Sequence, residues 1–99
     1  SPAEHIIRKL QDLGANIHIY DPYFSSSQVF GITCEDNIED IISKVDAVII
    51  VTGHDEFKKL QIHTFTKMQH PILIDTRGII DPSIAKQEKL IFRGLGRGN

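Results

Sequence analysis

The sequence contains very little cysteine, with Cys34 as the only one among 99 residues. One thiol cannot form a disulfide within the chain, which agrees with a reducing compartment. Long apolar runs are also missing, and no stretch approaches the roughly 20 residues that a membrane-spanning helix needs. The opening segment SPAEHIIRKL has neither the basic flank nor the long apolar centre of a signal peptide. We therefore expect a cytoplasmic protein without a membrane partner.

An excess of charge of one sign is absent as well. The chain has 11 Lys and Arg against 13 Asp and Glu, and its formal net charge is −2. This balance excludes a broad basic surface for nucleic acid, so any anionic ligand must be held locally. Apolar residues make up 40% of the sequence, which argues against disorder. The length of 99 residues predicts one domain, residues 1–99, around one core.

Helical and extended patterns alternate along the chain, which predicts an α/β fold with a mostly parallel sheet. Residues 1–14 have apolar side chains at helical spacing and end at the stop signal Gly14. Residues 47–52 are almost continuously apolar, so we expect them to form the central strand. The other expected strands are residues 17–20, 71–75 and 90–94, with residues 29–32 open between loop and strand. The other expected helices are residues 35–45, 54–60, 61–70 and 82–89, the last starting at Asp81-Pro82.

Ligands of parallel α/β sheets gather beyond the carboxyl ends of the strands. In this sequence those ends read YDPY, VTGHDEF and IDTRG. Asp21 in the first is most simply a turn residue whose carboxylate accepts hydrogen bonds from nearby backbone N–H groups. His54 in the second stands beside two acids at an expected helix start, where capping explains the acids without catalysis.

The third strand end carries the strongest candidate, Arg77. A guanidinium in the turn after an apolar strand can donate two hydrogen bonds to a phosphate, a carboxylate or a pair of sugar hydroxyls. The alternative is a surface salt bridge to Asp75 or Asp81, which would contribute little to stability.

Metal, thiol and dinucleotide chemistry have little support in the sequence. The histidines show no H-x-x-x-H spacing and no Cys/His pairing, so we expect no metal site. Cys34 has no general base nearby in the sequence, which favours a structural thiol. The glycines at Gly94, Gly96 and Gly98 miss the G-x-G-x-x-G spacing of a dinucleotide site, and no acid follows to hold a ribose.

Four stretches together carry a family resemblance. Residues 1–24 contain SPA and YDP, residues 36–60 a strand followed by HDEF, residues 71–80 DTRG, and residues 94–98 read GLGRG. They resemble the carboxyl-terminal, UDP-binding domain of the UDP-glucose/GDP-mannose dehydrogenase family. The resemblance implies a nucleotide-sugar dehydrogenase that oxidises the C6 alcohol of a sugar to a carboxylate for polysaccharide precursor synthesis.

The resemblance also implies that most of the enzyme lies outside this chain. In the family, NAD is bound by an amino-terminal Rossmann domain, and the catalytic cysteine lies in a central region. Cys34 does not match the catalytic position, so we expect no catalytic residue here and no activity of the isolated fragment. The implied partners are a UDP-sugar, the remaining domains of the dehydrogenase, and further copies in a homo-oligomer.

Two site residues and a fold follow from the resemblance. Arg77 corresponds to the arginine of an aspartate-x-arginine motif that reaches the UDP-sugar, and Asp75 orients the turn. The implied fold is a Rossmann-like, three-layer α/β/α arrangement that lacks the family's first strand. Its loss would leave backbone groups unpaired, so we expect pairing with another copy or a changed strand order. The VTGHDEF and DTRG stretches resemble those of enzymes acting on UDP-N-acetylmannosamine or similar acetamido sugars more than those of UDP-glucose enzymes.

The alternative from another class is a non-catalytic α/β interaction or dimerisation module without a small ligand. A receiver-like module is disfavoured, because Asp21 has no paired acidic neighbour. A dimerisation role fits every feature except a special need for Arg77.

Overall fold

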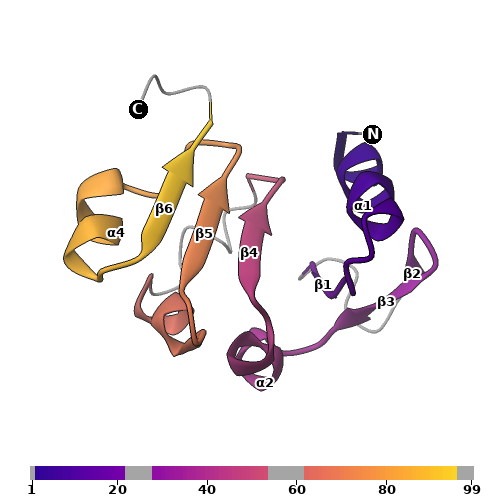
Figure 1. Cartoon of the computed structure of the whole chain (residues 1–99), viewed down its shortest axis with the longest axis horizontal. Coiled ribbons are helices and arrows are strands. Elements are labelled where there is room, and N and C mark those ends of the chain that lie inside the picture. The colour runs from indigo at the N-terminus through magenta and orange to yellow at the C-terminus, as the bar shows by residue number, and fades with distance from the viewer. Residues whose placement is uncertain (1, 22–27, 54–61, 96–99) are drawn as a thin grey trace. The chain divides into compact units, whose positions relative to one another are not determined.

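The computed structural model describes residues 2–21, 28–53 and 62–95, which belong to two compact units, Ser1–Ile38 and Glu39–Asn99. Each unit has its own three-stranded sheet with parallel pairing (Figure 1). The fold is therefore the mixed α/β, Rossmann-like type that the sequence predicts. The single domain and the three-layer arrangement stay predictions. Among the described residues, no helix is both long and apolar enough to cross a membrane.

The first unit opens with helix α1, Pro2–Asp12. It ends where the sequence predicts, because Gly14 adopts a φ of +92°, which a residue with a side chain rarely adopts. The N–H of Gly14 donates to the carbonyl of Gln11 at 2.9 Å, and that of Ala15 to Leu10 at 2.9 Å. This pair of bonds is a Schellman motif and satisfies carbonyls that the helix end leaves open.

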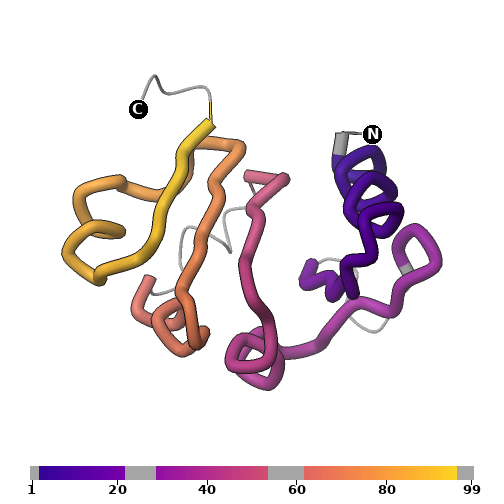
Figure 2. Tube along the Cα trace, viewed as in Figure 1, coloured from indigo at the N-terminus to yellow at the C-terminus, as the bar shows by residue number. Residues whose placement is uncertain are grey.

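The sheet of the first unit has the order β1-β3-β2. Strand β1, Ile19–Tyr20, runs parallel to β3, Ile32–Glu35, and β2, Gln28–Val29, is antiparallel to β3. Phe30 and Gly31 join β2 and β3 in a two-residue turn (Figure 2). The segment that the sequence left open between loop and strand is thus a hairpin.

The second unit holds a fully parallel sheet of order β4-β5-β6. The strands are β4, Ala47–Ile50, β5, Ile72–Asp75, and β6, Ile91–Gly94. Within the described residues the middle strand is β5, so the expectation that residues 47–52 are central is wrong for this sheet. An apolar run is typical of a strand covered on both faces, but it does not show which strands are its neighbours, and in β4 only Ile50 is buried.

Short helical segments connect the strands. Helix α2, Ile38–Ile41, continues into the 3₁₀ helix η1, Ile42–Lys44, and a second 3₁₀ helix, η2, covers Ile62–Lys67. Helix α2 begins later than the expected residue 35, because residues 32–35 extend to form β3. The expected helix at residues 54–60 lies outside the described residues.

Helix α4, Pro82–Gln87, starts where the sequence predicts. The carboxylate of Asp81 accepts a hydrogen bond from the N–H of Ser83 at 2.9 Å and caps the helix.

A polar contact links α2 to η2. Lys67 and Thr64 of η2 donate hydrogen bonds to the carboxylate of Glu39 in α2. The ammonium of Lys67 holds the pKa of Glu39 below its usual value.

The core of the second unit lies on one face of its sheet. Alternate residues of β5 are buried, and Leu73 and Asp75 are both 0% exposed. The other buried apolar side chains of this unit come from β4, both 3₁₀ helices, α4 and the loops beside them: Ile42, Ile50, Phe65, Met68, Ile80, Ala85 and Leu90. Burying an aliphatic or aromatic side chain of this size contributes about 1.5–3 kcal/mol. The last residue of β5 therefore points its carboxylate into an apolar core.

Candidate functional site

The buried carboxylate of Asp75 organises the loop that follows β5. Its Oδ1 accepts hydrogen bonds from the N–H groups of Arg77 and Gly78, both at 2.9 Å. Its Oδ2 accepts one from the N–H of Ile80 at 2.8 Å. A buried carboxylate is stable only when such donors replace water, and charge-assisted bonds of this kind are the strong ones. Asp75 therefore fixes the backbone of residues 76–80.

The same loop is tied to the carboxyl end of β4. Thr76 donates to the carbonyl of Ile50 twice, from its N–H at 3.0 Å and from its hydroxyl at 2.6 Å. Beyond β4 the chain passes close to the loop, since a methyl group added to Gly53 would lie 3.6 Å from Ile79 Cγ2 and 4.0 Å from Arg77 Cβ. Two of the three predicted strand ends, IDTRG and the described part of VTGHDEF, thus lie side by side. Asp21, from the remaining strand end, follows β1 in the other unit.

Arg77 lies on the outside of this loop with an exposed side chain. Within the described ranges its guanidinium takes part in no hydrogen bond or ion pair, whereas its backbone N–H is held by Asp75. The two acids proposed as salt-bridge partners have other roles: Asp75 binds backbone N–H groups, and Asp81 caps α4. In this part of the chain the salt-bridge alternative therefore finds no support. A fixed backbone with a free planar cation is suited to binding an anion.

Cys34 has the properties of a structural thiol. It is 3% exposed, and burial raises the pKa of its thiol, with the nearby carboxylates of Asp21 and Glu35 acting in the same direction. A thiol with a raised pKa has little reactive thiolate. In the part of the chain that the structure describes, no group of three or more His, Cys, Asp or Glu side chains is placed to hold a metal ion.

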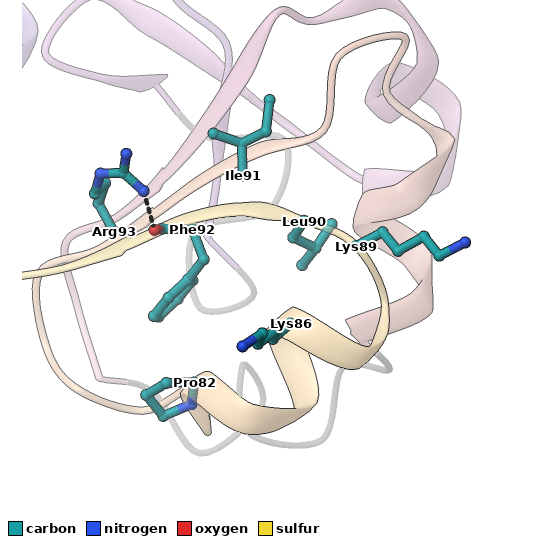
Figure 3. Close-up of a pocket in the computed structure, with 7 residues that line it drawn as sticks. All are labelled: Pro82, Lys86, Lys89, Leu90, Ile91, Phe92 and Arg93. Atoms are coloured by element: carbon teal, nitrogen blue, oxygen red, sulfur yellow. Dashed lines mark hydrogen bonds between the residues drawn. The ribbon is translucent and has the colours of Figure 1, made fainter. Parts of the chain in front are cut away.

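The structure also contains a groove that the sequence did not reveal. It has a volume of about 430 Å³ and is lined by Pro82, Lys86, Lys89, Leu90, Ile91, Phe92 and Arg93 (Figure 3). Arg77 is not among these residues, so the groove is separate from the loop after β5. The sequence pattern of residues 90–94 indicates only a strand. The available signal was the set of three cations around an apolar run.

The fold and the site together define an α/β protein with an exposed arginine on a strand-end loop that a buried carboxylate holds in place. Comparison with known proteins is consistent with this class. Residues 1–82 match the UDP-glucose/GDP-mannose dehydrogenase family, UDP binding domain, and the chain belongs to this family. No solved structure matches the chain at a significant level.

The relatives are dehydrogenases of nucleotide sugars. The UDP-N-acetyl-D-mannosamine dehydrogenase of Pyrococcus horikoshii is 34% identical over 101 residues, covering 100% of this chain and 22% of the relative. The enzyme of the same name from Methanococcus maripaludis is 28% identical, covering 99% of this chain and 23% of the relative. The UDP-glucose 6-dehydrogenase of Rhizobium meliloti is 28% identical, with 98% and 23% covered. The chain thus spans less than a quarter of the length of these relatives.

Proposed function

We propose that this chain binds the UDP part of a nucleotide sugar within an NAD-dependent dehydrogenase. The whole protein would oxidise the C6 alcohol of the sugar to a carboxylate and supply precursors for polysaccharide synthesis. Family membership supports this proposal, and the names of the relatives agree with it. The observation that carries it is the exposed guanidinium of Arg77 on a loop fixed by a buried carboxylate.

The two site residues have different roles in this proposal. The planar guanidinium of Arg77 would donate paired hydrogen bonds to a phosphate or to sugar hydroxyls. Asp75 is a positioning residue, because three backbone N–H groups already occupy its oxygens and it is closed off from solvent. It acts on the ligand only through the loop that presents Arg77.

NAD, the hydride acceptor of such dehydrogenases, does not fit the residues of this site. A dinucleotide site needs a glycine-rich turn between a strand and a helix. The described loops after β4 and β5 each contain one glycine, Gly53 and Gly78. We therefore propose that the cofactor and the catalytic cysteine belong to other parts of the protein, and that this fragment alone is inactive.

A UDP titration tests the proposal. The amide NMR signals of residues 75–80 should shift saturably, and Arg77→Ala should weaken the affinity about tenfold or more, because a hydrogen bond to a charged group contributes about 1.5–3 kcal/mol. Arg93→Ala, which removes another exposed guanidinium from the same unit, is the matched control and should bind UDP like the parent. Equal affinities of the parent and Arg77→Ala would contradict the assignment.

One observation favours the alternative, an interaction or dimerisation module. Residues 47–51 are uncharged and apolar, yet in the described part of the chain β4 pairs with β5 alone. The open edge of such a strand is a template for pairing with another chain. The same feature supports a homo-oligomer, with copies of this domain in contact.

Two finer expectations remain parts of the proposal. The sugar of the substrate would carry an acetamido group. The protein would lie in the cytoplasm, and the free, buried Cys34 fits such a reducing compartment.

A further inference from the structure

The groove beside β6 has two walls of different kinds. One wall is strand β6 with the turn before it, and the other is helix α4. Figure 3 shows Phe92, Lys86 and Pro82 in the space between the strand and the helix. The rings of Phe92 and Pro82 thus form an apolar surface next to the ammonium group of Lys86.

The outer edge of β6 is not paired with another strand in the part of the chain that the structure describes. The N–H of Ile91 donates to Pro71 at 2.8 Å and that of Leu95 to Asp75 at 3.0 Å, so alternate residues of β6 face β5. In a parallel ladder the residues between them, Phe92 and Gly94, direct their N–H and C=O groups to the opposite edge, where Phe92 is half-exposed and Gly94 is buried. In the described ranges no strand pairs with that edge.

The edge carbonyl of Phe92 has a partner from its own strand. The guanidinium of Arg93 donates a hydrogen bond to this carbonyl at 2.8 Å. Charged side chains on an edge strand are a common device against uncontrolled pairing with other chains. The contact is exposed, so an incoming strand can replace it at little cost.

The charge of the groove is positive, although the chain as a whole is slightly acidic. Lys86, Lys89 and Arg93 line it, and no carboxylate does. Two acids close by in the sequence have partners of their own: Glu88 contacts Nδ1 of His63 at 3.3 Å, and Asp81 caps α4. No carboxylate in the lining of the groove would therefore compete with an anionic ligand for these three cations.

We propose that the α4–β6 groove binds an extended acidic peptide segment of another polypeptide, which adds as a strand to the outer edge of β6. Backbone pairing at the half-exposed Phe92 would supply part of the affinity, as in other cases of strand addition. Lys86 and Lys89, in α4 and the turn after it, select carboxylate side chains, and the exposed Ile91, on the opposite face of β6 from Phe92, contacts the apolar residues between them. The lining includes neither Arg77 nor Asp75, so this site is additional to the proposed UDP site.

The experiment uses a fluorescein-labelled peptide, acetyl-EVEVEVE-amide, and fluorescence anisotropy with the intact protein. Binding should be saturable, should weaken as NaCl rises from about 50 to about 300 mM, and should be lost with the lysine analogue acetyl-KVKVKVK-amide. The double variant K86E/K89E should raise the Kd about tenfold or more, whereas K9E/K44E, at two exposed lysines outside the groove, should stay within about twofold of the parent. Similar effects of the two double variants would overturn the proposal.

Peptide chemistry tests the backbone pairing without changing the protein. One probe carries N-methyl groups on every valine amide and a second carries them on every glutamate amide, so that each blocks one edge of the peptide. At least one probe should lose binding, and hydrogen exchange at residues 91–95 should slow when the parent peptide binds. If both methylated probes bind like the parent, the strand-addition mode is wrong. Saturating UDP should leave the peptide Kd unchanged, so failure of this proposal is distinguishable from failure of the UDP site.

Discussion

At the scale of single residues, Asp75 has the largest structural effect on the site. Its carboxylate is 0% exposed and accepts three backbone hydrogen bonds, two at Oδ1 and one at Oδ2. In Asp75→Asn one oxygen becomes an NH₂ group, which cannot accept the hydrogen bond from the backbone N–H of Ile80. Two buried donors, this NH₂ group and the N–H of Ile80, would then face each other. We expect a loss of about 3 kcal/mol in the free energy of unfolding, measured by urea denaturation.

The control for Asp75→Asn is Asp81→Asn, since asparagine also caps helices well and Asp81 is exposed. That variant should stay within about 0.5 kcal/mol of the parent. Equal stabilities of the two variants would show that the loop does not depend on the buried carboxylate.

A second residue-scale prediction concerns the turn between β2 and β3. Phe30 and Gly31 have φ angles of +52° and +78°, and Phe30 is 41% exposed. Two-residue hairpin turns with both φ angles positive prefer Asn-Gly, because a bulky side chain is strained there. Phe30→Asn should therefore raise the free energy of unfolding by about 0.5–1 kcal/mol. Gly31→Ala should lower it, although a methyl group there meets nothing within 4 Å; a stabilising effect of Gly31→Ala would contradict the explanation from φ.

At the scale of elements, α1 and α4 end in the same motif with different residues. After α4 the N–H of Leu90 donates to Ala85 and that of Lys89 to Lys86, both at 3.0 Å, which is the Schellman pattern seen after α1. The position that glycine occupies after α1 is taken here by Lys89, with a φ of +64°. Lys89→Gly should therefore stabilise the protein by about 1 kcal/mol in thermal or urea unfolding.

The matched variant in α1 is Gly14→Ala, which introduces the strain that Lys89→Gly removes. It should destabilise by about 1 kcal/mol, even though the space around Gly14 is empty. Changes of the same sign in the two variants would refute the shared explanation.

Sequence signals predicted those elements whose cause is local. The stop at Gly14 and the start at Asp81-Pro82 follow from backbone and capping chemistry within a few residues, and both are confirmed. The strand order was not predictable in this way, since pairing joins residues far apart in sequence, as with Ile19 and Cys34. The same distinction applies to the site: Arg77 could be selected from its place after a strand, whereas the groove needs α4 and β6 folded together.

At the scale of the whole molecule, one edge of β4 has no partner strand among the described residues, and another chain could pair with it. Its residues 47–50 are apolar, and in the described part of the chain only one side of the strand is paired. If copies of the protein associate through this edge, a charge on it should oppose pairing. Ala47 is exposed, so Ala47→Lys places an ammonium on the strand without filling the core.

Light scattering over a dilution series measures the result. The parent should show a mass that falls on dilution, and Ala47→Lys should shift the midpoint of that fall to about tenfold higher concentration, because like charges would meet across a symmetric pairing. Ser43→Lys adds the same charge at an exposed position before the strand, and it should dissociate at the parent's concentration. A parent that is monomeric throughout would exclude self-association through β4, and the strand would then require a partner strand from elsewhere in its own polypeptide.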